Sequence, residues 1–328
     1  MLQELVESLK IYREYVEGKK FLVTGGAGFI GSWVCDAIIS LGGSVICVDN
    51  LSTGNHSNIK HLLDSPNFTF INGNVEDLNP DDFKGVDYVL HLASMADPHE
   101  YQKYPISTML SNSMGTLKTL QIAELNSATY LLASTSEVYG DPLEHPQNEE
   151  HWGNVNPIGP RACYDESKRF AEALTMSFHR EKNLDIRIAR IFNTYGPRLM
   201  DGRVVPKFIK QLLNNEPLTI YGNGTQTRSF CYITDLVEGL FHLLFRGKPG
   251  VYNLGNPDER SILEVVDELK RITGMNLEIT FHPLPQDDPT KRRPDITKAR
   301  EELGFEPKVD FSEGLRRTFE WFRNEVMK

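Results

Sequence analysis

A glycine-rich turn between a short strand and a helix constrains the fold of this chain more than any other feature. The apolar run Phe21–Thr24 predicts a buried strand, and Ser32–Leu41 predicts a helix. Between them, Thr24-Gly25-Gly26-Ala27-Gly28-Phe29-Ile30-Gly31 satisfies both G-x-G-x-x-G and G-x-x-G-x-x-G. Glycines allow the backbone to approach a pyrophosphate closely, and the N–H groups of the helix N-terminus face its phosphates. The turn therefore predicts a dinucleotide-binding strand–helix unit.

An acidic residue at the end of the next strand indicates which dinucleotide is bound. Val45–Asp49 predicts a second strand, and Asp49 follows Gly31 by 18 residues. An aspartate at this position hydrogen-bonds the ribose hydroxyls and repels a 2′-phosphate. The residues after it, Asn50-Leu51-Ser52-Thr53, include no arginine. The expected cofactor is therefore NAD rather than NADP.

Strands and helices alternate along the first two thirds of the chain. Further strands are expected at 68–72, 88–93, 130–134 and 186–191, with helices at 106–125 and 164–182. Repeated alternation with fully apolar strands predicts an α/β fold, a Rossmann-like doubly wound parallel sheet. After about residue 194, turn-rich segments separate short strands and helices. They predict a smaller C-terminal substrate-binding lobe.

The chain divides on these patterns into three parts. Residues 1–19 are expected to form an N-terminal helical extension, because Leu2, Leu5, Leu9, Ile11 and Tyr12 follow an amphipathic pattern that fits packing on the body or on a partner. Residues 20–194 are expected to form the NAD-binding Rossmann domain, and 195–328 mainly the substrate-binding lobe, with some return to the Rossmann domain.

Charge and cysteine content exclude several functional classes. The chain has 328 residues and a formal net charge of −10, which argues against nonspecific nucleic-acid binding. Its four cysteines form no C-x-x-C, so neither a disulfide framework nor a zinc site is expected. A cytoplasmic location is expected instead. The nine histidines show no metal spacing, so no metal is expected. The longest apolar runs are shorter than a membrane span.

Two further patterns predict chemistry. Tyr164 and Lys168 lie four residues apart, so on a helix they share a face, and the ammonium is expected to lower the pKa of the phenol. Solvated helices often have this spacing, so the pair gains its weight from two features upstream, the nucleotide motif and a Ser/Thr-rich strand end. The segment Ala133–Gly140 ends a strand at the ligand edge of the sheet, where its hydroxyls could bond an alcohol and Glu137 could move a proton. The alternative is a surface turn with local caps.

The glycine motif, the strand-end Ser/Thr pair and Tyr-x-x-x-Lys together resemble the extended short-chain dehydrogenase/reductase superfamily. Over about residues 20–325 the chain is similar to nucleotide-sugar enzymes, and within them to the UDP-glucuronate decarboxylase (UDP-xylose synthase) family. Pro-Arg-x-x-Tyr, ending at Tyr164, is the most specific match, since it separates decarboxylases from many epimerases. The matching segments are Leu132–Pro142, Asn156–Glu166, Arg190–Arg198, Asp201–Val205, Gln226–Phe230, Asp287–Pro289 and Arg292–Asp295.

The resemblance implies conversion of UDP-glucuronate to UDP-xylose through a UDP-4-keto sugar, with NAD regenerated. Tyr164, activated by Lys168, would take the proton of the sugar 4-hydroxyl while hydride passes from C4 to NAD. The resulting β-keto acid would lose carbon dioxide before reprotonation at C5 and return of the hydride. Glu137 would lie near C5, and Arg292 would meet the carboxylate or the site of proton donation.

The site residues that the resemblance implies fall into three sets. The catalytic set is Thr135, Ser136, Glu137, Tyr164, Lys168 and Arg292. The cofactor set is Gly25, Gly28, Phe29, Ile30, Gly31, Asp49, Asn50, Ser52, Thr53, Gly54, Asn74, Val75, Leu92, Ala93, Ser94, Tyr164 and Lys168. The substrate set is Tyr101, Arg161, Asn193, Arg203, Tyr221, Arg228 and Arg292. The resemblance also implies a homodimer through a four-helix bundle of helices 106–125 and 164–182.

The chain departs from the family pattern at three places and leaves rival functions open. Ser94-Met95-Ala96-Asp97-Pro98 replaces the usual Ser-Pro-Ala-Ser-Pro, Asn74-Val75 replaces Asp-Val, and Ser107 replaces a frequent lysine. The alternatives are a UDP-glucuronate 4-epimerase or another nucleotide-sugar epimerase or dehydratase, although dehydratases usually have Asp where this chain has Ser136. A noncatalytic NAD-binding sensor or scaffold is the alternative of another class; such proteins typically lose the Tyr or the Lys.

Overall fold

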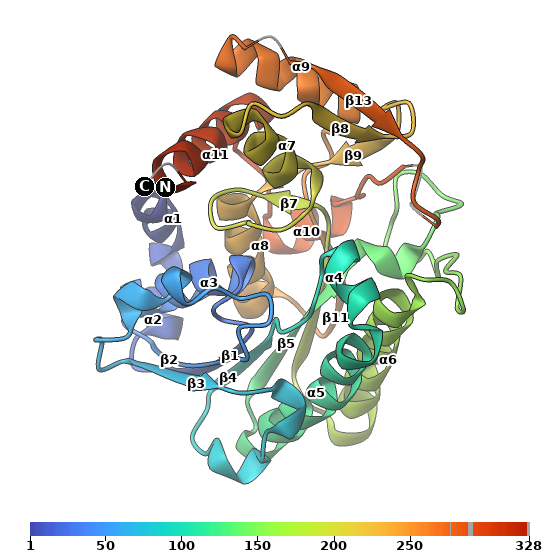
Figure 1. Cartoon of the computed structure of the whole chain (residues 1–328). Coiled ribbons are helices and arrows are strands. Elements are labelled where there is room, and N and C mark those ends of the chain that lie inside the picture. The colour runs from blue at the N-terminus through green and yellow to red at the C-terminus, as the bar shows by residue number, and fades with distance from the viewer. Residues whose placement is uncertain (276, 288–290, 327–328) are drawn as a thin grey trace.

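A parallel sheet of seven strands forms the centre of the molecule (Figure 1), which a computed structural model describes over residues 1–275, 277–287 and 291–326. The strand order is β11-β6-β5-β4-β1-β2-β3, and each neighbouring pair is parallel. Because the order reverses between β1 and β4, the sheet is doubly wound, and the predicted fold class is confirmed. Its strands are β1 (Lys20–Thr24), β2 (Ser44–Asp49), β3 (Phe68–Asn72), β4 (Tyr88–His91), β5 (Thr129–Thr135), β6 (Ile186–Ile191) and β11 (Gly250–Leu254).

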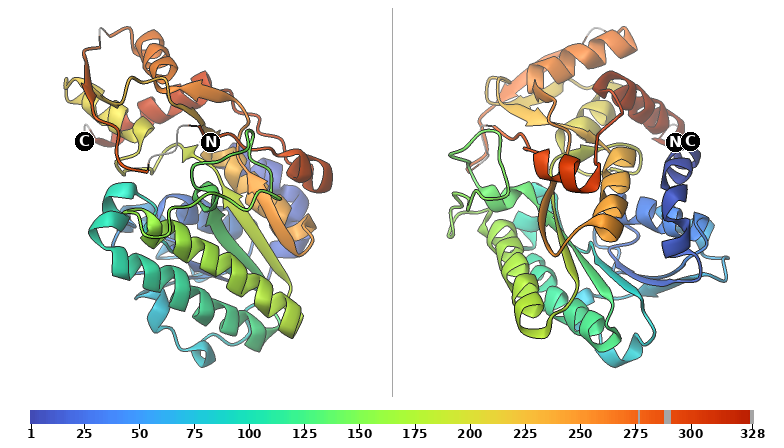
Figure 2. Two further views of the ribbon diagram at one scale, coloured as in Figure 1. Left: turned by 90° about the vertical axis from the view of Figure 1, so that its right-hand side faces the viewer. Right: turned by 180° about the vertical axis from the view of Figure 1, so that it is seen from behind.

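Helices cover both faces of this sheet (Figure 2). On one face lie α3 (Phe29–Ser40) and α8 (Ile233–Arg246), and on the other α5 (Pro105–Asn126) and α6 (Ala162–Lys182). Successive residues of β1 point to opposite faces, so Phe21 and Val23 join one core cluster while Leu22 joins the other. This two-sided burial explains why the strands read as continuous apolar runs.

The bounds of several elements differ from those predicted. The helix expected from Ser32 begins at Phe29, within the glycine turn, and the strand expected to end at Ala93 ends at His91. Gly250–Leu254 adds β11 to the main sheet by pairing with β6. No local pattern assigned that strand to this sheet, because its partner lies some sixty residues earlier in the chain.

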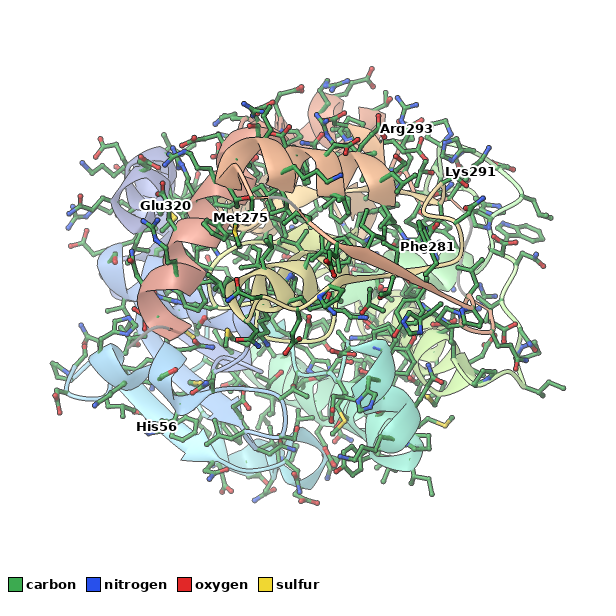
Figure 3. The ribbon with its side chains drawn as sticks, turned by 45° about the horizontal axis from the view of Figure 1, so that its top comes forward. His56, Met275, Phe281, Lys291, Arg293 and Glu320 are labelled. Atoms are coloured by element: carbon green, nitrogen blue, oxygen red, sulfur yellow. The ribbon has the colours of Figure 1, made fainter. Side chains whose placement is uncertain are left out.

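The smaller lobe consists of paired short strands and helices. Phe281 on β13 is exposed, and Lys291 and Arg293 lie where the described chain resumes after 287 (Figure 3). The remaining elements, here and in the connections, are α4 (Pro98–Lys103), β7 (Thr194–Tyr195), α7 (Val204–Leu213), β8 (Leu218–Tyr221), β9 (Thr227–Ser229), β10 (Cys231–Tyr232), β12 (Glu259–Ser261), α9 (Ile262–Thr273), β13 (Ile279–His282), α10 (Thr297–Leu303) and α11 (Phe311–Val326).

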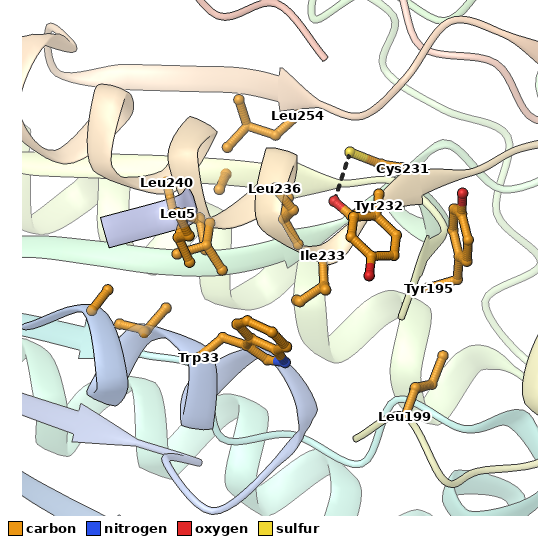
Figure 4. Packing of buried hydrophobic residues seen from close by; sticks show 14 of the residues in the cluster. Leu5, Trp33, Tyr195, Leu199, Cys231, Tyr232, Ile233, Leu236, Leu240 and Leu254 are labelled. Carbon is orange, nitrogen blue, oxygen red and sulfur yellow. Dashed lines mark hydrogen bonds between the residues drawn. The ribbon is translucent and has the colours of Figure 1, made fainter. Parts of the chain in front are cut away.

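The N-terminal segment packs on the body of the protein. It forms α1 (Leu2–Leu9), a 3-10 turn (Lys10–Tyr12) and α2 (Arg13–Val16). Leu5 and Leu9 are buried, and Leu5 lies close to Leu240 of α8 (Figure 4). The Tyr12 hydroxyl is hydrogen-bonded to Nδ1 of His242. Ile11, expected on the packed face, is 58% exposed, because the 3-10 turn rotates it out of the helical stripe.

Within the described residues, no helix has both the length and the apolar character needed to cross a bilayer.

Candidate active site

Two cavities adjoin at the carboxyl ends of the parallel strands, where doubly wound sheets bind their ligands. The larger, of about 820 Å³, is lined by the glycine turn and the ends of β2 and β4. The smaller, of about 290 Å³, is lined by the end of β5, the start of α6 and the smaller lobe. Ser94 and Ala133 line both, so ligands in the two cavities would meet there.

The larger cavity has the features that a dinucleotide requires. A Cβ on Gly25 would come within 2.8 Å of the Ala93 backbone, and one on Gly31 within 2.1 Å of the Gly25 carbonyl oxygen. Both positions therefore require glycine. The Asp49 carboxylate at the end of β2 accepts hydrogen bonds from the backbone N–H groups of Ala27, at 3.0 Å, and Leu51, at 2.8 Å. Burial raises the pKa of Asp49, while these backbone bonds oppose the rise.

Most of the predicted cofactor residues line this larger cavity: Gly25, Gly28, Phe29, Ile30, Gly31, Asp49, Asn50, Ser52, Thr53, Gly54, Val75, Leu92, Ala93 and Ser94. Asn74 lies beside it, where its Oδ1 accepts a hydrogen bond from Nδ2 of Asn50 at 2.9 Å. Tyr164 and Lys168 line the smaller cavity instead. The glycine turn, the acid and the predicted catalytic pair are thus assembled around one junction.

Tyr164 and Lys168 lie near the start of α6, and both side chains are buried. The ammonium donates to the Ala133 carbonyl oxygen at 2.9 Å and lies 5.9 Å from the centre of the Tyr164 ring. Burial lowers the pKa of Lys168 to about 7, and Glu172 opposes that change. Burial also raises the pKa of Tyr164, which the Thr135 hydroxyl only partly offsets. The expected net lowering of the Tyr164 pKa is not found in this structure: burial outweighs the Thr135 hydrogen bond, and the Lys168 ammonium points at a carbonyl.

Tyr101, on α4, holds the Tyr164 ring from one side. The two rings are stacked, with their centres 5.0 Å apart and their planes 3° from parallel. The Cys163 thiol donates to the Tyr101 carbonyl oxygen at 3.4 Å, which ties α4 to the start of α6. The Tyr101 hydroxyl is buried and has no hydrogen-bond partner among the described residues. Tyr101 therefore restricts the orientation of Tyr164 and offers a polar group beside the cavity.

Glu137 lies in a 3-10 turn (Ser136–Tyr139) that directly follows β5. Its Oε2 accepts from Nη2 of Arg161 at 2.9 Å and from Nη2 of Arg292 at 3.1 Å. Burial alone would raise the pKa of Glu137, but the guanidinium groups of Arg292, Arg161 and Arg228 outweigh it and lower that pKa. Glu137 is therefore held as a carboxylate.

Arg292 lies behind Glu137 and is only 1% exposed. Its Nη1 donates to the Ser136 carbonyl oxygen at 2.9 Å, and it is not part of the lining of either cavity. In this arrangement it positions Glu137. The predicted contact between Arg292 and the sugar stays a prediction.

The other predicted substrate residues lie around the smaller cavity. Asn193, Arg203, Tyr221 and Arg228 line it together with Tyr101 and Arg161. Arg203 also borders the larger cavity and forms an ion pair with Asp201 at 2.6 Å. One matched segment begins at Asp287. Its other two residues, Asp288 and Pro289, lie outside the described residues.

Sequence reasoning missed a buried polar network behind the strand-end hydroxyls. The Ser134 hydroxyl donates to Oε1 of Glu172 at 2.6 Å, and Arg190 donates to Oε2 of the same carboxylate at 2.8 Å. Arg190 also donates to the Tyr139 hydroxyl at 2.9 Å. Glu172 follows Lys168 by one helical turn, and this spacing was the only local signal. The network holds the ends of β5 and β6 against α6.

Sequence reasoning also missed Lys207, which lines both cavities, and Asp97. Asp97 followed by Pro98 is a helix-start signature that would have identified it as a cap.

Comparison with known proteins agrees with this geometry. Residues 21–255 match the NAD dependent epimerase/dehydratase family. The chain belongs to this family. Within the family it is 49% identical over 310 residues to UDP-glucuronic acid decarboxylase 1 of Arabidopsis thaliana, covering 94% of this chain and 71% of that protein. It is equally similar, at 49% over 311 residues, to UDP-glucuronic acid decarboxylase 1 of Xenopus tropicalis, covering 94% of this chain and 73% of that protein.

A solved structure of the family shows the same architecture. UDP-glucuronic acid 4-epimerase from Bacillus cereus, in complex with UDP-glucuronic acid and NAD, is 30% identical with a TM-score of 0.85. The comparison covers 93% of this chain and 99% of that one. Epimerases and decarboxylases of the family thus share this fold, and residues within the site must distinguish their reactions.

Proposed function

We propose that this protein is a carboxy-lyase that uses bound NAD to convert UDP-glucuronate to UDP-xylose. The observation that carries the proposal is the similarity to UDP-glucuronic acid decarboxylases at 49% identity over 94% of the chain. The site supports it, because Tyr164, Lys168 and Glu137 line one cavity beside a dinucleotide cavity. Arg161, from the Pro-Arg-x-x-Tyr motif, contacts Glu137 directly.

The glycine turn and Asp49 would hold NAD in the larger cavity, with the turn at its phosphates and the acid at its ribose. When bound there, NAD supplies a reversible hydride acceptor for C4 of the sugar. Tyr164 and Lys168 lie beside the junction with the smaller cavity, where C4 would be presented.

The chain's own residues would then move the protons. Tyr164, in its phenolate form, takes the proton of the sugar 4-hydroxyl, which Thr135 and Ser136 hold by hydrogen bonds. The C5–carboxylate bond breaks, carbon dioxide leaves, and the bonding electrons pass to the C4 ketone as an enolate. A proton is added at C5 near Glu137, and Tyr164 finally returns its proton to O4. The proton added at C5 comes from solvent, so each turnover consumes one proton and releases one carbon dioxide, and atoms and electrons balance.

The proton NMR spectrum of purified protein incubated with UDP-glucuronate and a trace of NAD tests this function. UDP-xylose should appear without net NADH. Tyr164→Phe should lower the rate by at least about a hundredfold while leaving NAD binding intact, because it removes only the proton carrier.

Other spectra would change the conclusion. Formation of UDP-galacturonate would establish the 4-epimerase, the second candidate, which the Bacillus cereus structure favours. An unchanged spectrum with NAD bound would favour another nucleotide sugar or a noncatalytic sensor.

A homodimer through α5 and α6 belongs to the same proposal. One stripe of α5 presents exposed apolar side chains at helical spacing: Ile106, Met109, Leu110 and Met114. Phe170 of the adjoining α6 is 50% exposed. Exposed apolar side chains on two neighbouring helices are typical of an interface, and a two-fold axis would make it a four-helix bundle. The cytoplasm is the proposed compartment, because all four cysteines are free thiols.

A further inference from the structure

The segment Arg198–Arg203, called the strap below, connects β7 to α7 and borders both cavities. All six of its residues line the larger cavity, and Leu199, Gly202 and Arg203 also line the smaller one. The same larger cavity is lined by the glycine turn at the start of α3. A dinucleotide bound there would therefore contact two walls, the glycine turn of the Rossmann domain and the strap that leads into the smaller lobe.

Asp97 fastens one end of the strap to the Rossmann domain. Its Oδ2 accepts a hydrogen bond from the backbone N–H of Gly202 at 2.6 Å. Its Oδ1 accepts from the backbone N–H of His99 at 2.8 Å and so caps α4. The residue is only 8% exposed, so water competes little for either oxygen. Hydrogen bonds of this kind, to a charged and shielded acceptor, are stronger than neutral ones.

Arg198 fastens the other end to α3. Its Nη2 donates to Oδ2 of Asp36 at 2.7 Å, and its guanidinium lies 4.8 Å from the centre of the Trp33 ring. The Trp33 indole N–H also donates to the Pro197 carbonyl oxygen at 3.2 Å. Arg198 has a φ of 76°, in the left-handed region that a non-glycine residue seldom adopts. Such a backbone persists only where surrounding contacts hold it, and Asp36 and Trp33 supply them.

We propose that the strap retains the dinucleotide between turnovers, with Asp97 and Arg198 as its two fasteners. This inference rests on the proposed function, in which NAD ends each cycle in the oxidation state in which it began. That chemistry requires no exchange of NAD, so slow release does not limit turnover. Asp97 and Arg198 both hold the strap in place at the wall of the cavity, and neither is needed for proton transfer at Tyr164.

The test measures release of NAD from Asp97→Asn protein. His99 and Gly202 donate to different oxygens of Asp97, and in asparagine one of these oxygens is replaced by an NH2 group that cannot accept, so one of the two hydrogen bonds is lost. Asp310→Asn is the matched control, because Asp310 accepts from the Ser312 N–H at 2.9 Å at the start of α11 and lines neither cavity. Each protein is loaded with radiolabelled NAD and chased with excess unlabelled NAD, and the retained label is followed by filter binding.

The strap proposal predicts that NAD leaves Asp97→Asn about ten times faster than the unaltered protein, since one charge-assisted hydrogen bond is lost. Asp310→Asn should match the unaltered protein. Arg198→Lys, which retains the charge but replaces the guanidinium that lies over the Trp33 ring, should also release NAD faster. Equal release rates in all four proteins would refute the proposal, as would release from the unaltered protein that is faster than its turnover.

The release assay and the NMR assay test the strap proposal and the proposed function independently. UDP-xylose formation with unchanged release rates in Asp97→Asn and Arg198→Lys would reject the strap and leave the proposed function standing. Faster release in both variants without any UDP-xylose would support the strap as a retaining element and reject the proposed reaction.

Discussion

At the scale of single residues, the turn that contains Glu137 has features of both predicted alternatives, a locally capped turn and a site for proton transfer. The Thr135 hydroxyl accepts from the Glu137 backbone N–H at 3.2 Å, so the strand end does contain a local cap. The Glu137 side chain, however, is directed at Arg161 and Arg292. A surface turn would have no reason to bury a carboxylate between guanidinium groups, because such a pair must overcome desolvation. The burial therefore favours a role in chemistry.

Glu137→Gln should slow the decarboxylation stage more than hydride transfer. The amide is neutral, so it can neither assist proton movement at C5 nor balance the two arginines as the carboxylate does. Single-turnover absorbance should show NADH forming at near the normal rate and decaying at least about tenfold more slowly. Equal slowing of both phases would mean that Glu137 only positions the substrate.

Lys168→Met should change stability in a pH-dependent way in NAD-free protein. Burial lowers the folded-state pKa of Lys168 from 10.5 to about 7, so between these values the unfolded chain binds more protons and stability rises with pH. Below about pH 7 the cost of the buried charge is complete, and methionine removes it. Urea unfolding should show the variant's advantage in free energy of unfolding to be largest at pH 6 and to shrink by pH 9.5. A pH-independent difference would contradict this account.

At the scale of elements, the periodicity of apolar residues predicted whether a segment is a helix or a strand better than it predicted where that element begins and ends. The strands expected at 68–72 and 186–191 have those bounds in the structure. Helices extended beyond their predicted starts, as α3 does into the glycine turn. The start of a helix depends on which groups accept hydrogen bonds from its first backbone N–H groups, and the spacing of apolar residues does not indicate those groups.

The N-terminal segment offers a test of which element contacts stabilise the fold. Leu9 is fully buried against the core, whereas Ile11, two residues later, is 58% exposed. Leu9→Ala should therefore lower the free energy of unfolding by about 2–5 kcal/mol. Ile11→Ala on the same segment should change it by less than about 0.5 kcal/mol. Urea denaturation measures both, and similar values for the two would mean that the segment is not docked as described.

At the scale of the whole molecule, the two lobes are joined by contacts between residues far apart in the chain. Gly202 to Asp97 and Arg198 to Asp36 link the connection between β7 and α7 to the Rossmann domain. The sheet itself is completed by β11, which follows α8. The cavities thus lie at a junction whose two sides come from different halves of the chain.

Leu110→Glu should convert the proposed dimer to monomer. A carboxylate at this position would lie in the apolar stripe of α5, where burial against a second copy leaves it unpaired. Light scattering coupled to gel filtration should report half the mass of the unaltered protein. Ile11→Glu, on an exposed apolar position of the N-terminal segment, should leave the mass unchanged. Equal masses for all three proteins would remove this face as the interface.

The sequence by itself determined the features that short-range sterics and spacing control. These are the glycine turn, the strand periodicity, the acid at the end of β2, and the helical spacing that directs Tyr164 and Lys168 to one cavity. Only the tertiary structure decided the rest. Glu137 meets Arg292 across 155 residues, and Asp36 meets Arg198 across 162. Such pairs leave no local period in the chain, and burial, which depends on the whole fold, sets the pKa of Lys168 and Tyr164.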